Sequence, residues 1–485
     1  MAWRKALARV YGGLILPIKT LHLTNYWHER SGGISTFYRQ LLQAAERSGR
    51  RMVLVVPGAR DQVQEIGSGC RLYQLTAPAS PLNPHYRTIY PREFLLPGTR
   101  IQRILAAERP QLVEICDKYS LIYLAPLLRL GLARELGFRP VVVGLTCERM
   151  DENFAAYVSK SWWGRTFSRL YMRHVYFPFF DHHIANSDHT AGELREVAAG
   201  HAVTRGVWTR PMGVDTDHFT PAKRSSETRK LLRGHFSAPG ESTLLLYAGR
   251  LVPEKNLELL IATMEELNQA GRDFRLIVVG DGIARQWFQQ SADSRVRGRV
   301  CLLGHVSDRE QLAQIYASCD FFLHPNPKEP FGIGPLEAMA SGLPLIVPDR
   351  GGVTSYTTEL NAYPAPPGAE AFAQAILRAC QDVEQRVGKI RAARETAELY
   401  SWPKVTDSFL SLYETIYQAG SNHDTLNAAS PAFVSTPPRP GQARLLHVTS
   451  KLAQLGFSIY EFTGRLLTRF QGETRRMCET EMETM

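Results

Sequence analysis

Short apolar runs alternate with segments of helical periodicity along most of this chain. Met52–Val56 is a continuous apolar run that ends at Pro57-Gly58, and Val141–Leu145 is a similar run further on. Between such runs, apolar residues recur every three or four positions, as they do on one face of a helix. Strands that alternate with helices and lack hairpin turns are expected to pair in parallel through crossover connections. The sequence therefore predicts an α/β fold built on parallel sheets.

The same rhythm occurs in both halves of the chain, which predicts two domains. A polar segment at residues 219–228, with Pro221 and several basic side chains, separates the halves. We therefore place a first domain at residues 18–218 and a second at residues 219–402, sizes that are ordinary for single cores. The strands expected are Leu21–Leu23, Met52–Val56, Leu112–Ile115, Val141–Leu145 and His183–Ala185, then Leu244–Ala248, Arg275–Val279, Val300–Leu303, Phe321–His324 and Pro344–Val347.

The ends of the chain differ in character from these domains. Residues 1–17 form a basic leader without a signal-peptide cleavage site. Residues 403–420 have the apolar spacing of a helix, and residues 421–441 are rich in Ser, Pro, Asn and Ala, which predicts a flexible linker. Residues 442–485 mix apolar and basic side chains. An amphipathic tail there could pack on the body, or it could lie on a membrane surface.

Composition restricts the class of protein. The content is 44% hydrophobic and 21% charged, as in a globular protein, and no run approaches the roughly 20 apolar residues that span a bilayer. Seven cysteines without a Cys-x-x-Cys pair favour a reducing, cytoplasmic compartment over a disulfide framework or a zinc site. The net charge of +10 attracts phosphate-bearing partners such as an anionic membrane surface or acceptor, although it could serve only solubility. No nucleic-acid-binding motif is present.

Two glutamates eight positions apart, Glu329 and Glu337, lie in the run from Lys328 to Pro344. A short apolar strand precedes this run, Gly332 and Gly334 lie between the carboxylates, and a helical pattern follows. Such a strand–loop–helix order leaves backbone N–H groups free at the positive end of a helix, where a diphosphate binds well. Carboxylates on either side can accept hydrogen bonds from sugar hydroxyls. The run therefore predicts a nucleotide-sugar site.

An ordered set of motifs resembles those of the retaining glycosyltransferases with two Rossmann-like domains, the GT-B type of glycosyltransferase family 4 (glycosyl transferases group 1). The resemblance extends over most of residues 18–420 and implies two Rossmann-like parallel-sheet domains that face a central cleft, with a C-terminal crossover helix and a flexible tail. The motifs are Ser31-Gly32-Gly33-Ile34, Gly213-Val214-Asp215, Tyr247-Ala248-Gly249-Arg250 leading to Lys255, Gly280-Asp281-Gly282, Gly304-His305-Val306 and the glutamate pair.

The resemblance also implies roles for individual residues on the donor side. Arg250 and Lys255 would stabilise the diphosphate as it leaves, and Glu329 would accept hydrogen bonds from the hydroxyls of the donor sugar. Glu337 would bind the ribose hydroxyls. The remaining donor-binding residues would be Gly33, Gly249, Val306, Phe331, Gly332, Ile333 and Gly334.

The acceptor side departs from the family pattern. The family usually has a histidine just after the strand that here reads Val141–Leu145, whereas this chain has Cys147 followed by Glu148. A thiol is a much weaker hydrogen-bond partner than imidazole. Gly32, Cys147 and Glu148 are the acceptor-side candidates, and either Glu148 or Asp151 could supply the missing polarity.

The resemblance implies a retaining, metal-independent hexosyltransferase. The donor would be a UDP-, GDP- or ADP-sugar, without a further cofactor, and no Asp-x-Asp cluster occurs in a suitable place for a metal. The acceptor would be a hydroxyl of a glycan, a lipid-linked sugar or a small molecule, in glycolipid, polysaccharide or other glycoconjugate synthesis. The alternatives are a nucleotide-sugar epimerase on the same fold and a non-catalytic nucleotide-sugar-binding protein.

Overall fold

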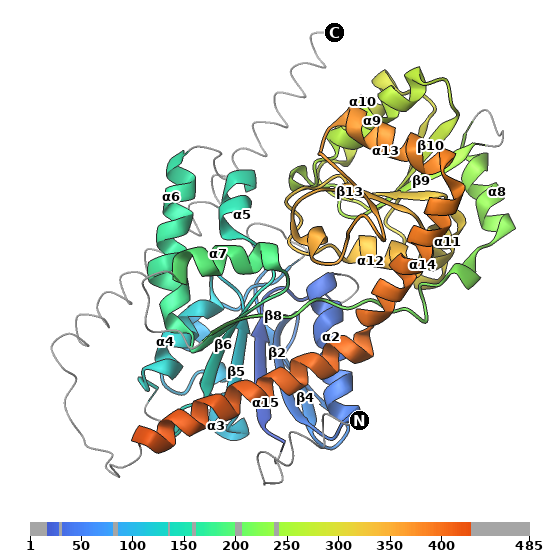
Figure 1. The fold of residues 1–485 in the computed structure, drawn as a ribbon. Helices are drawn as coiled ribbons and strands as arrows, with labels where there is room; N and C mark the ends of the chain where they lie inside the picture. Colours follow the sequence, from blue (N-terminus) through green and yellow to red (C-terminus); the bar gives the residue numbers. More distant parts are fainter. Residues whose placement is uncertain are drawn as a thin grey trace. The chain divides into compact units, whose positions relative to one another are not determined.

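The structure is a computed structural model and describes residues 17–28, 32–80, 86–133, 136–157, 162–198, 206–236 and 242–427. Ser31, nearly all of the predicted leader, the greater part of the predicted linker and the whole predicted tail lie outside these residues. The described part contains two β-sheets, each flanked by helices, and this confirms the predicted α/β fold class (Figure 1).

The first sheet has eight strands in the order β3-β4-β2-β1-β5-β6-β7-β8. Strand β1 pairs in parallel with both β2 and β5, and β7 pairs in parallel with β8. The strands are β1 (Lys19–Thr24), β2 (Arg51–Gly58), β3 (Gln62–Ile66), β4 (Cys70–Thr76), β5 (Leu112–Cys116), β6 (Val141–Thr146), β7 (His182–Ala185) and β8 (Gly206–Thr209). The α-helices in this part of the chain are α2 (Gly33–Arg47), α3 (Arg100–Glu108), α4 (Leu124–Arg129), α5 (Met150–Tyr157), α6 (Trp162–Tyr171) and α7 (Asp188–Ala198).

The prediction that hairpins are absent is wrong at one edge of this sheet. Strands β3 and β4 pair in antiparallel fashion around a short turn. Gly67 in that turn has φ of 59°, a left-handed conformation that glycine adopts without strain. The hairpin gave little signal in the sequence because β3 is exposed and polar, so no buried alternation of apolar residues marks it.

The second sheet has six strands in the order β11-β10-β9-β12-β13-β14, and all of its strand pairs are parallel. Figure 1 shows its strands between a group of α9, α10 and α13 and a group of α8, α11, α12 and α14. The strands are β9 (Thr243–Ala248), β10 (Phe274–Val279), β11 (Val300–Gly304), β12 (Phe321–Leu323), β13 (Leu345–Pro348) and β14 (Tyr363–Ala365). The helices are α8 (Ser226–Gly234), α9 (Glu258–Gln269), α10 (Arg285–Arg295), α11 (Arg309–Ser318), α12 (Ile333–Ala340), α13 (Ala369–Gln381) and α14 (Val383–Leu399).

The core of this second sheet is apolar on both faces, as a parallel sheet requires. On one face, the fully buried Leu245 and Leu276 pack in one cluster with Ile261 on α9 and Ile376 on α13. At the alternate positions, which point to the other face, Leu246 and Ile277 are also fully buried. Strand β9 has β10 on one side and β12 on the other. Following the chain, β10 and β11 are therefore added on one side of β9, and β12, β13 and β14 are added on the other side. Ligands of such sheets bind in the crevice at the carboxyl ends of the strands, at this point of reversal.

The last described helix, α15 (Trp402–Asn427), is longer than predicted. It continues past residue 420 into the segment predicted as a linker. Gly420 and Ser421 are poor helix formers, but the first proline beyond them is Pro431, so nothing earlier forces the helix to end. Residues 421–427, at the start of the segment predicted as a linker, therefore belong to α15.

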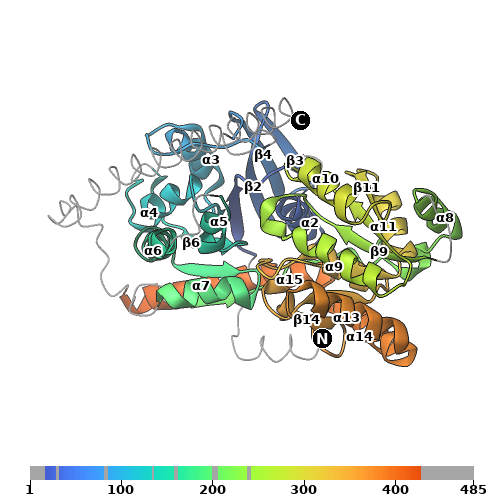
Figure 2. The ribbon, with the colours of Figure 1, turned by 90° about the horizontal axis from the view of Figure 1, so that it is seen from above.

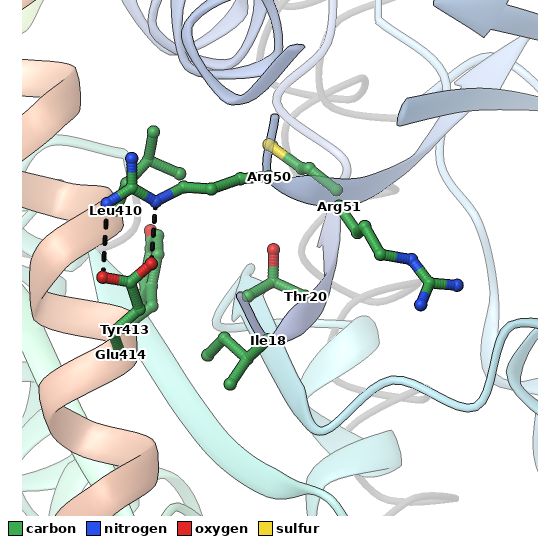
Figure 3. A pocket seen from close by; sticks show the side chains of 8 residues that line it. Ile18, Thr20, Arg50, Arg51, Leu410, Tyr413 and Glu414 are labelled. Carbon is green, nitrogen blue, oxygen red and sulfur yellow. Dashed lines mark hydrogen bonds and ion pairs between the residues drawn. The ribbon is translucent and has the colours of Figure 1, made fainter. Parts of the chain in front are cut away.

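By compactness the described chain separates into two units, and the chain passes between them more than once, including within β6 and within α15. One unit contains the described residues up to Trp27, residues 38–143 and α15 from Leu410 onward, and the other contains the described residues of 28–37 and residues 144–409. Within the first unit, Tyr413 of α15 donates a hydrogen bond to buried Glu114 on β5. A small cavity lies beside this contact, and Arg50 closes one side of it by pairing with Glu414 at 2.8 Å (Figure 3). The cavity is lined by Ile18, Thr20, Arg50, Arg51, Met52, Leu410, Tyr413 and Glu414.

Candidate active site

Two neighbouring strands of the second sheet deliver the central donor residues predicted from the sequence to one edge. Strand β9 ends at Ala248 and is followed by Gly249 and Arg250, while β12 ends at Leu323 ahead of the loop that carries Glu329. Strands β9 and β12 pair in parallel, so their carboxyl ends lie at the same edge of the sheet. The order of the strands therefore brings together residues that are far apart in the sequence.

Lys255 and Glu329 form the centre of the site. The Lys255 ammonium lies 2.8 Å from Oε1 and 2.7 Å from Oε2 of Glu329, and both side chains are largely buried. Asn326 donates a further hydrogen bond from Nδ2 to Glu329 Oε2 at 3.0 Å. Lysine has three N–H donors, so one remains for a ligand, and the carboxylate keeps lone pairs for sugar hydroxyls.

The surroundings of Glu329 keep it ionised. Burial by itself would raise the pKa of Glu329, but the charge of Lys255 and the hydrogen bonds from Lys255 and Asn326 lower that pKa to about 2. His324 Nε2 lies 3.9 Å from Glu329 Oε2. Burial lowers the pKa of His324 to about 4, so this imidazole is neutral near pH 7. The site therefore holds one ionised carboxylate and one ammonium.

The amino end of α12 lies next to this pair and has no capping side chain. Gly332 precedes the helix with φ of 89°, and no acidic residue occupies the first turn. The Cβ that another residue would add at Gly332 would lie 3.3 Å from Glu329 Cγ, which places the helix start beside the carboxylate. Tyr356 holds the turn by donating to the Gly332 carbonyl at 2.5 Å, and its ring packs against that of Phe331 at 5.2 Å. The amides at Ile333 and Gly334 thus begin a helix whose positive end is open to an anion.

Glu337 is held differently from Glu329. Tyr316 on α11 donates to Glu337 Oε2 at 2.9 Å. Burial raises the pKa of Glu337 to about 7, although the hydrogen bond from Tyr316 opposes this shift. Gly334 connects the two regions, because a Cβ there would lie 3.3 Å from the Ala248 carbonyl at the end of β9 and 3.5 Å from the Tyr316 hydroxyl. Glu337 can therefore change its charge near neutral pH.

Glycines let the loops of the site approach one another closely. A Cβ at Gly280 would lie 1.9 Å from the carbonyl oxygen of Gly249, and Gly280 itself has φ of 135°. A Cβ at Gly352 would lie 1.9 Å from the Pro330 carbonyl, while the Gly352 amide donates to the Glu329 carbonyl at 2.6 Å. Only glycine fits such approaches, so both positions have a structural role in shaping the site.

Arg250 and Val306 complete the donor residues expected from the sequence. The Arg250 side chain is 60% exposed, with Nη2 3.6 Å from Glu254 Oε1. Its backbone is held by Tyr247, whose hydroxyl donates to the Arg250 carbonyl at 3.0 Å. Val306 is half-buried in the loop after β11. Arg250 therefore combines a fixed backbone with a guanidinium that solvent, and hence a ligand, can reach.

The other predicted residues are Gly32 and Gly33, at the start of α2, and Cys147 and Glu148, after β6. Gly32 has φ of 110°, and a Cβ at Gly33 would lie 2.7 Å from Ile333 Cδ1. Cys147 is half-buried, and its carbonyl accepts a hydrogen bond from Asn186 Nδ2 at 3.3 Å. Glu148 accepts from Asn153 Nδ2 at 2.7 Å. The structure places Gly33 next to the start of α12 and leaves the roles of Gly32, Cys147 and Glu148 as predictions.

Two family models match the chain: the Glycosyltransferase Family 4 model at residues 31–218 and the Glycosyl transferases group 1 model at residues 228–396. Over 83% of the chain and all of the other protein, the fold matches sucrose-phosphate synthase from Thermosynechococcus elongatus with a TM-score of 0.62 at 23% identity. The chain is a GT-B glycosyltransferase. A second solved structure with the same fold is Anabaena HepE in complex with UDP and glucose, with a TM-score of 0.59 and 16% identity over 82% of this chain and all of that one.

Curated relatives of this glycosyltransferase match nearly full length. The GDP-mannose-dependent alpha-(1-6)-phosphatidylinositol dimannoside mannosyltransferase of Mycobacterium tuberculosis is 29% identical over 81% of this chain and 95% of the relative. A GDP-mannose-dependent alpha-mannosyltransferase of the same species is 28% identical over 79% of this chain and 93% of the relative.

The contacts that hold the site of this glycosyltransferase together were largely missed in the sequence. Ser187 caps the start of α7, where its Oγ accepts from the Thr190 amide at 3.1 Å. The same hydroxyl also contacts the Pro330 carbonyl, one residue after Glu329. Asn326 and Tyr316 were not singled out at all. Asn326 could have been suspected as a polar residue between prolines in the Glu329 loop, whereas no local pattern connects Tyr316 to Glu337.

Neither a metal site nor a membrane span emerges from the side chains and helices that the structure describes. In residues 17–427, apart from the short gaps noted above, no three His, Cys, Asp or Glu side chains gather as metal ligands would. Within the same residues, no helix is both long and apolar enough to cross a bilayer.

Proposed function

We propose that this glycosyltransferase transfers a hexosyl group, with mannose as the first candidate, from a nucleoside-diphosphate sugar to an acceptor hydroxyl with retention of configuration. The observation that carries the proposal is the Lys255–Glu329 pair beside the uncapped amino end of α12. A cation and a positive helix end suit a diphosphate, and an ionised carboxylate at the same place suits the hydroxyls of the attached sugar.

The chemistry proceeds by breaking the bond between the anomeric carbon and the diphosphate oxygen. Negative charge then develops on the leaving diphosphate. This charge is stabilised by Lys255, by the exposed guanidinium of Arg250 and by the α12 amides. Because the charge is larger in the transition state than in the bound donor, these groups stabilise the transition state more. The acceptor oxygen bonds to the anomeric carbon on the face that the diphosphate leaves, and its proton passes to a diphosphate oxygen. This balanced exchange needs neither a metal ion nor a further cofactor, and we propose that the enzyme uses none.

The remaining donor contacts follow the geometry of the site. The ribose hydroxyls would donate to Glu337, and the nucleobase would lie against the backbone near Val306, in the loop after β11. Gly33 and Gly249 would let backbone approach the donor without a side chain in the way. Gly32, Cys147 and Glu148 remain our candidates for the acceptor side.

The names of the relatives support a donor and a class of acceptor. Both mycobacterial relatives are named as GDP-mannose-dependent, and one is named for a phosphatidylinositol dimannoside. We therefore propose GDP-mannose as the donor to test before UDP- and ADP-sugars, and a lipid-linked sugar as the acceptor. Such an acceptor would place the enzyme at the cytoplasmic side of an anionic membrane. The relatives are named as transferases, and both family models describe glycosyltransferases. We therefore favour a transferase over an epimerase or a non-catalytic binding protein.

The test is transfer by the full-length protein. GDP-mannose, UDP-glucose and ADP-glucose are each incubated with phosphatidylinositol-based glycolipids, with and without EDTA, and the released nucleoside diphosphate is measured. The anomeric configuration of the product is read by NMR. We expect GDP release that depends on acceptor, resists EDTA and is lost in Lys255→Ala and Glu329→Ala, whereas Lys404→Ala, at an exposed position on α15, retains it. Transfer at the wild-type rate by a Lys255→Ala, Glu329→Ala double variant would refute the site, and an inverted product would refute retention.

A further inference from the structure

Helix α6 exposes the kind of side chains that helices of water-soluble proteins usually bury. Trp162 is 78% exposed, Trp163 is 49% exposed and Leu170 is 51% exposed. The two tryptophans begin the helix and Leu170 lies two turns further along, so the three share one broad side of it. The edge of Trp163 meets the ring of Phe154 on α5 at 5.9 Å, and Figures 1 and 2 both show α5 beside α6.

The buried side of α6 carries small residues instead. Gly164 and Ser168 are buried, and so is Met172 immediately after the helix, a spacing of four that marks one face. The Ser168 hydroxyl donates to the Gly164 carbonyl at 3.0 Å, so this buried hydroxyl has its hydrogen-bond partner within the helix. Gly164 and Ser168 let the helix pack closely on the body, while Trp162, Trp163 and Leu170 face solvent. Large apolar side chains are usually buried on a helix, and exposed apolar patches of this kind mark interaction surfaces.

A line of arginines borders the exposed apolar residues. Arg165, Arg169 and Arg173 also follow a spacing of four, and none forms an ion pair with any other residue that the structure describes. The sequence contains no aspartate or glutamate from residue 153 to residue 180. The nearest acidic residue before this segment, Glu152, is already engaged, because His189 Nε2 lies 3.1 Å from it. The exposed side of α6 is therefore apolar and basic, with no acidic side chain of its own.

We propose that this face, formed by Trp162, Trp163, Leu170, Arg165 and Arg169 on α6 and by Arg173 in the turn after it, binds the surface of an anionic lipid bilayer. Tryptophan is favoured at the boundary between headgroups and acyl chains, and arginine pairs with lipid phosphates. A basic border around an apolar strip is the pattern of helices that lie in a membrane interface. A second copy of this chain is a poorer occupant, because two such faces would bring unpaired arginines together.

This inference goes beyond the proposed reaction, since it concerns a surface outside the donor site. Bound in this way, the enzyme would stay in the plane where a lipid-linked acceptor presents its hydroxyls. Membrane binding is measured without donor or acceptor, so its failure and the failure of the proposed transfer can be told apart.

The experiment uses full-length protein and sedimentation with vesicles of phosphatidylcholine, alone or mixed with phosphatidylglycerol. The variants are Trp162→Ser/Trp163→Ser and Arg165→Glu/Arg169→Glu. Matched controls are Trp287→Ser, at a tryptophan 45% exposed on α10, and Arg297→Glu/Arg391→Glu, which reverses two exposed arginines elsewhere. We expect wild type and both controls to bind the anionic vesicles. A juxtamembrane arginine contributes roughly fivefold in affinity, so reversing two should weaken binding by more than tenfold.

The tryptophan variant should also bind at least roughly tenfold more weakly, because its apolar contact is lost. Circular dichroism and thermal unfolding confirm that each variant is folded. Equal binding by wild type and both α6 variants would overturn the proposal, and so would a loss that the controls share. Sedimentation velocity tests self-association. If wild type forms a concentration-dependent dimer and Trp162→Ser/Trp163→Ser does not, the face is a self-association surface and the proposal is overturned.

Discussion

The Lys255 ammonium contacts both carboxylate oxygens of Glu329, at 2.8 and 2.7 Å, across 74 positions of sequence. The parallel pairing of β9 with β12 brings the two loops to the same edge of the sheet. Lys255 keeps Glu329 ionised in a largely buried place, so the pair is prepared for a ligand before the ligand arrives. The proposed function therefore depends on the pair acting as one unit.

The first prediction concerns this coupling. We expect Lys255→Ala and Glu329→Gln each to lower kcat/KM by roughly 10²–10³-fold, because each removes a charge aimed at the donor. In the double variant the loss should be far smaller than the product of the two single losses, since one partner has little function without the other. Steady-state kinetics of the four proteins measure this. Two fully multiplicative losses would show that the residues act independently.

The second prediction is a pH dependence of donor binding. Ribose hydroxyls donate best to an ionised carboxylate, and the pKa of Glu337 is raised to about 7 by burial. Affinity for the nucleoside diphosphate should therefore rise as pH increases from about 6 to about 8, by up to roughly tenfold. Isothermal titration calorimetry across this range, with Glu337→Gln as the comparison, separates the effect of Glu337 from titration of the ligand itself. A wild-type profile identical to that of Glu337→Gln would contradict the prediction.

The same raised pKa has a consequence for stability. The folded state keeps the Glu337 proton at pH values where the unfolded chain, with a pKa near 4.5, has lost it. The contribution of this group to the free energy of unfolding is therefore largest below pH 4.5 and declines as pH rises toward about 7. Removing the hydroxyl in Tyr316→Phe takes away a hydrogen bond that lowers this pKa, so the decline should extend to higher pH. Chemical denaturation at several pH values tests the direction of the change.

The third prediction concerns close backbone approach. Gly352→Ala places a Cβ 1.9 Å from the Pro330 carbonyl oxygen, an impossible contact without movement of the Glu329 loop. We expect a loss of about 2–4 kcal/mol in the free energy of unfolding, together with weakened donor binding. Gly388→Ala is the control, because a Cβ there meets nothing within 4 Å and the residue lies inside α14. That change should stabilise the protein by up to about 1 kcal/mol. Equal melting temperatures for the two variants would disprove the argument.

The fourth prediction distinguishes two helix caps. Ser187 and Ser225 each accept from a backbone amide at 3.1 Å at the start of their helices, but only Ser187 also contacts the Pro330 carbonyl. Replacing either serine by alanine should lower the free energy of unfolding by about 1 kcal/mol. Ser187→Ala should in addition raise KM for the donor, because it frees the loop next to Glu329. Unfolding curves and kinetics for both variants provide the comparison, and an unchanged KM in Ser187→Ala would separate this contact from donor binding.

Local pattern was sufficient for most of the fold. The apolar runs at Met52–Val56 and Leu244–Ala248 are strands β2 and β9, because continuous burial leaves a strong signal. Strand β8 and strand β14 were not predicted, since both are short and take their definition from neighbours in the sheet. The exposed hairpin of β3 and β4 was missed for the opposite reason, that a solvated edge requires no apolar alternation.

By itself, the sequence determined the alternation of strands and helices, the family, and which loop would carry the two glutamates, because period and motif order are local properties of a chain. Only the tertiary structure decided that Glu329 is ionised against Lys255 while Glu337 titrates near neutrality. It also decided that Trp162, Trp163 and Leu170 of α6 face solvent. Charge state and exposure depend on burial and on partners distant in sequence, and these exist only once the chain has folded.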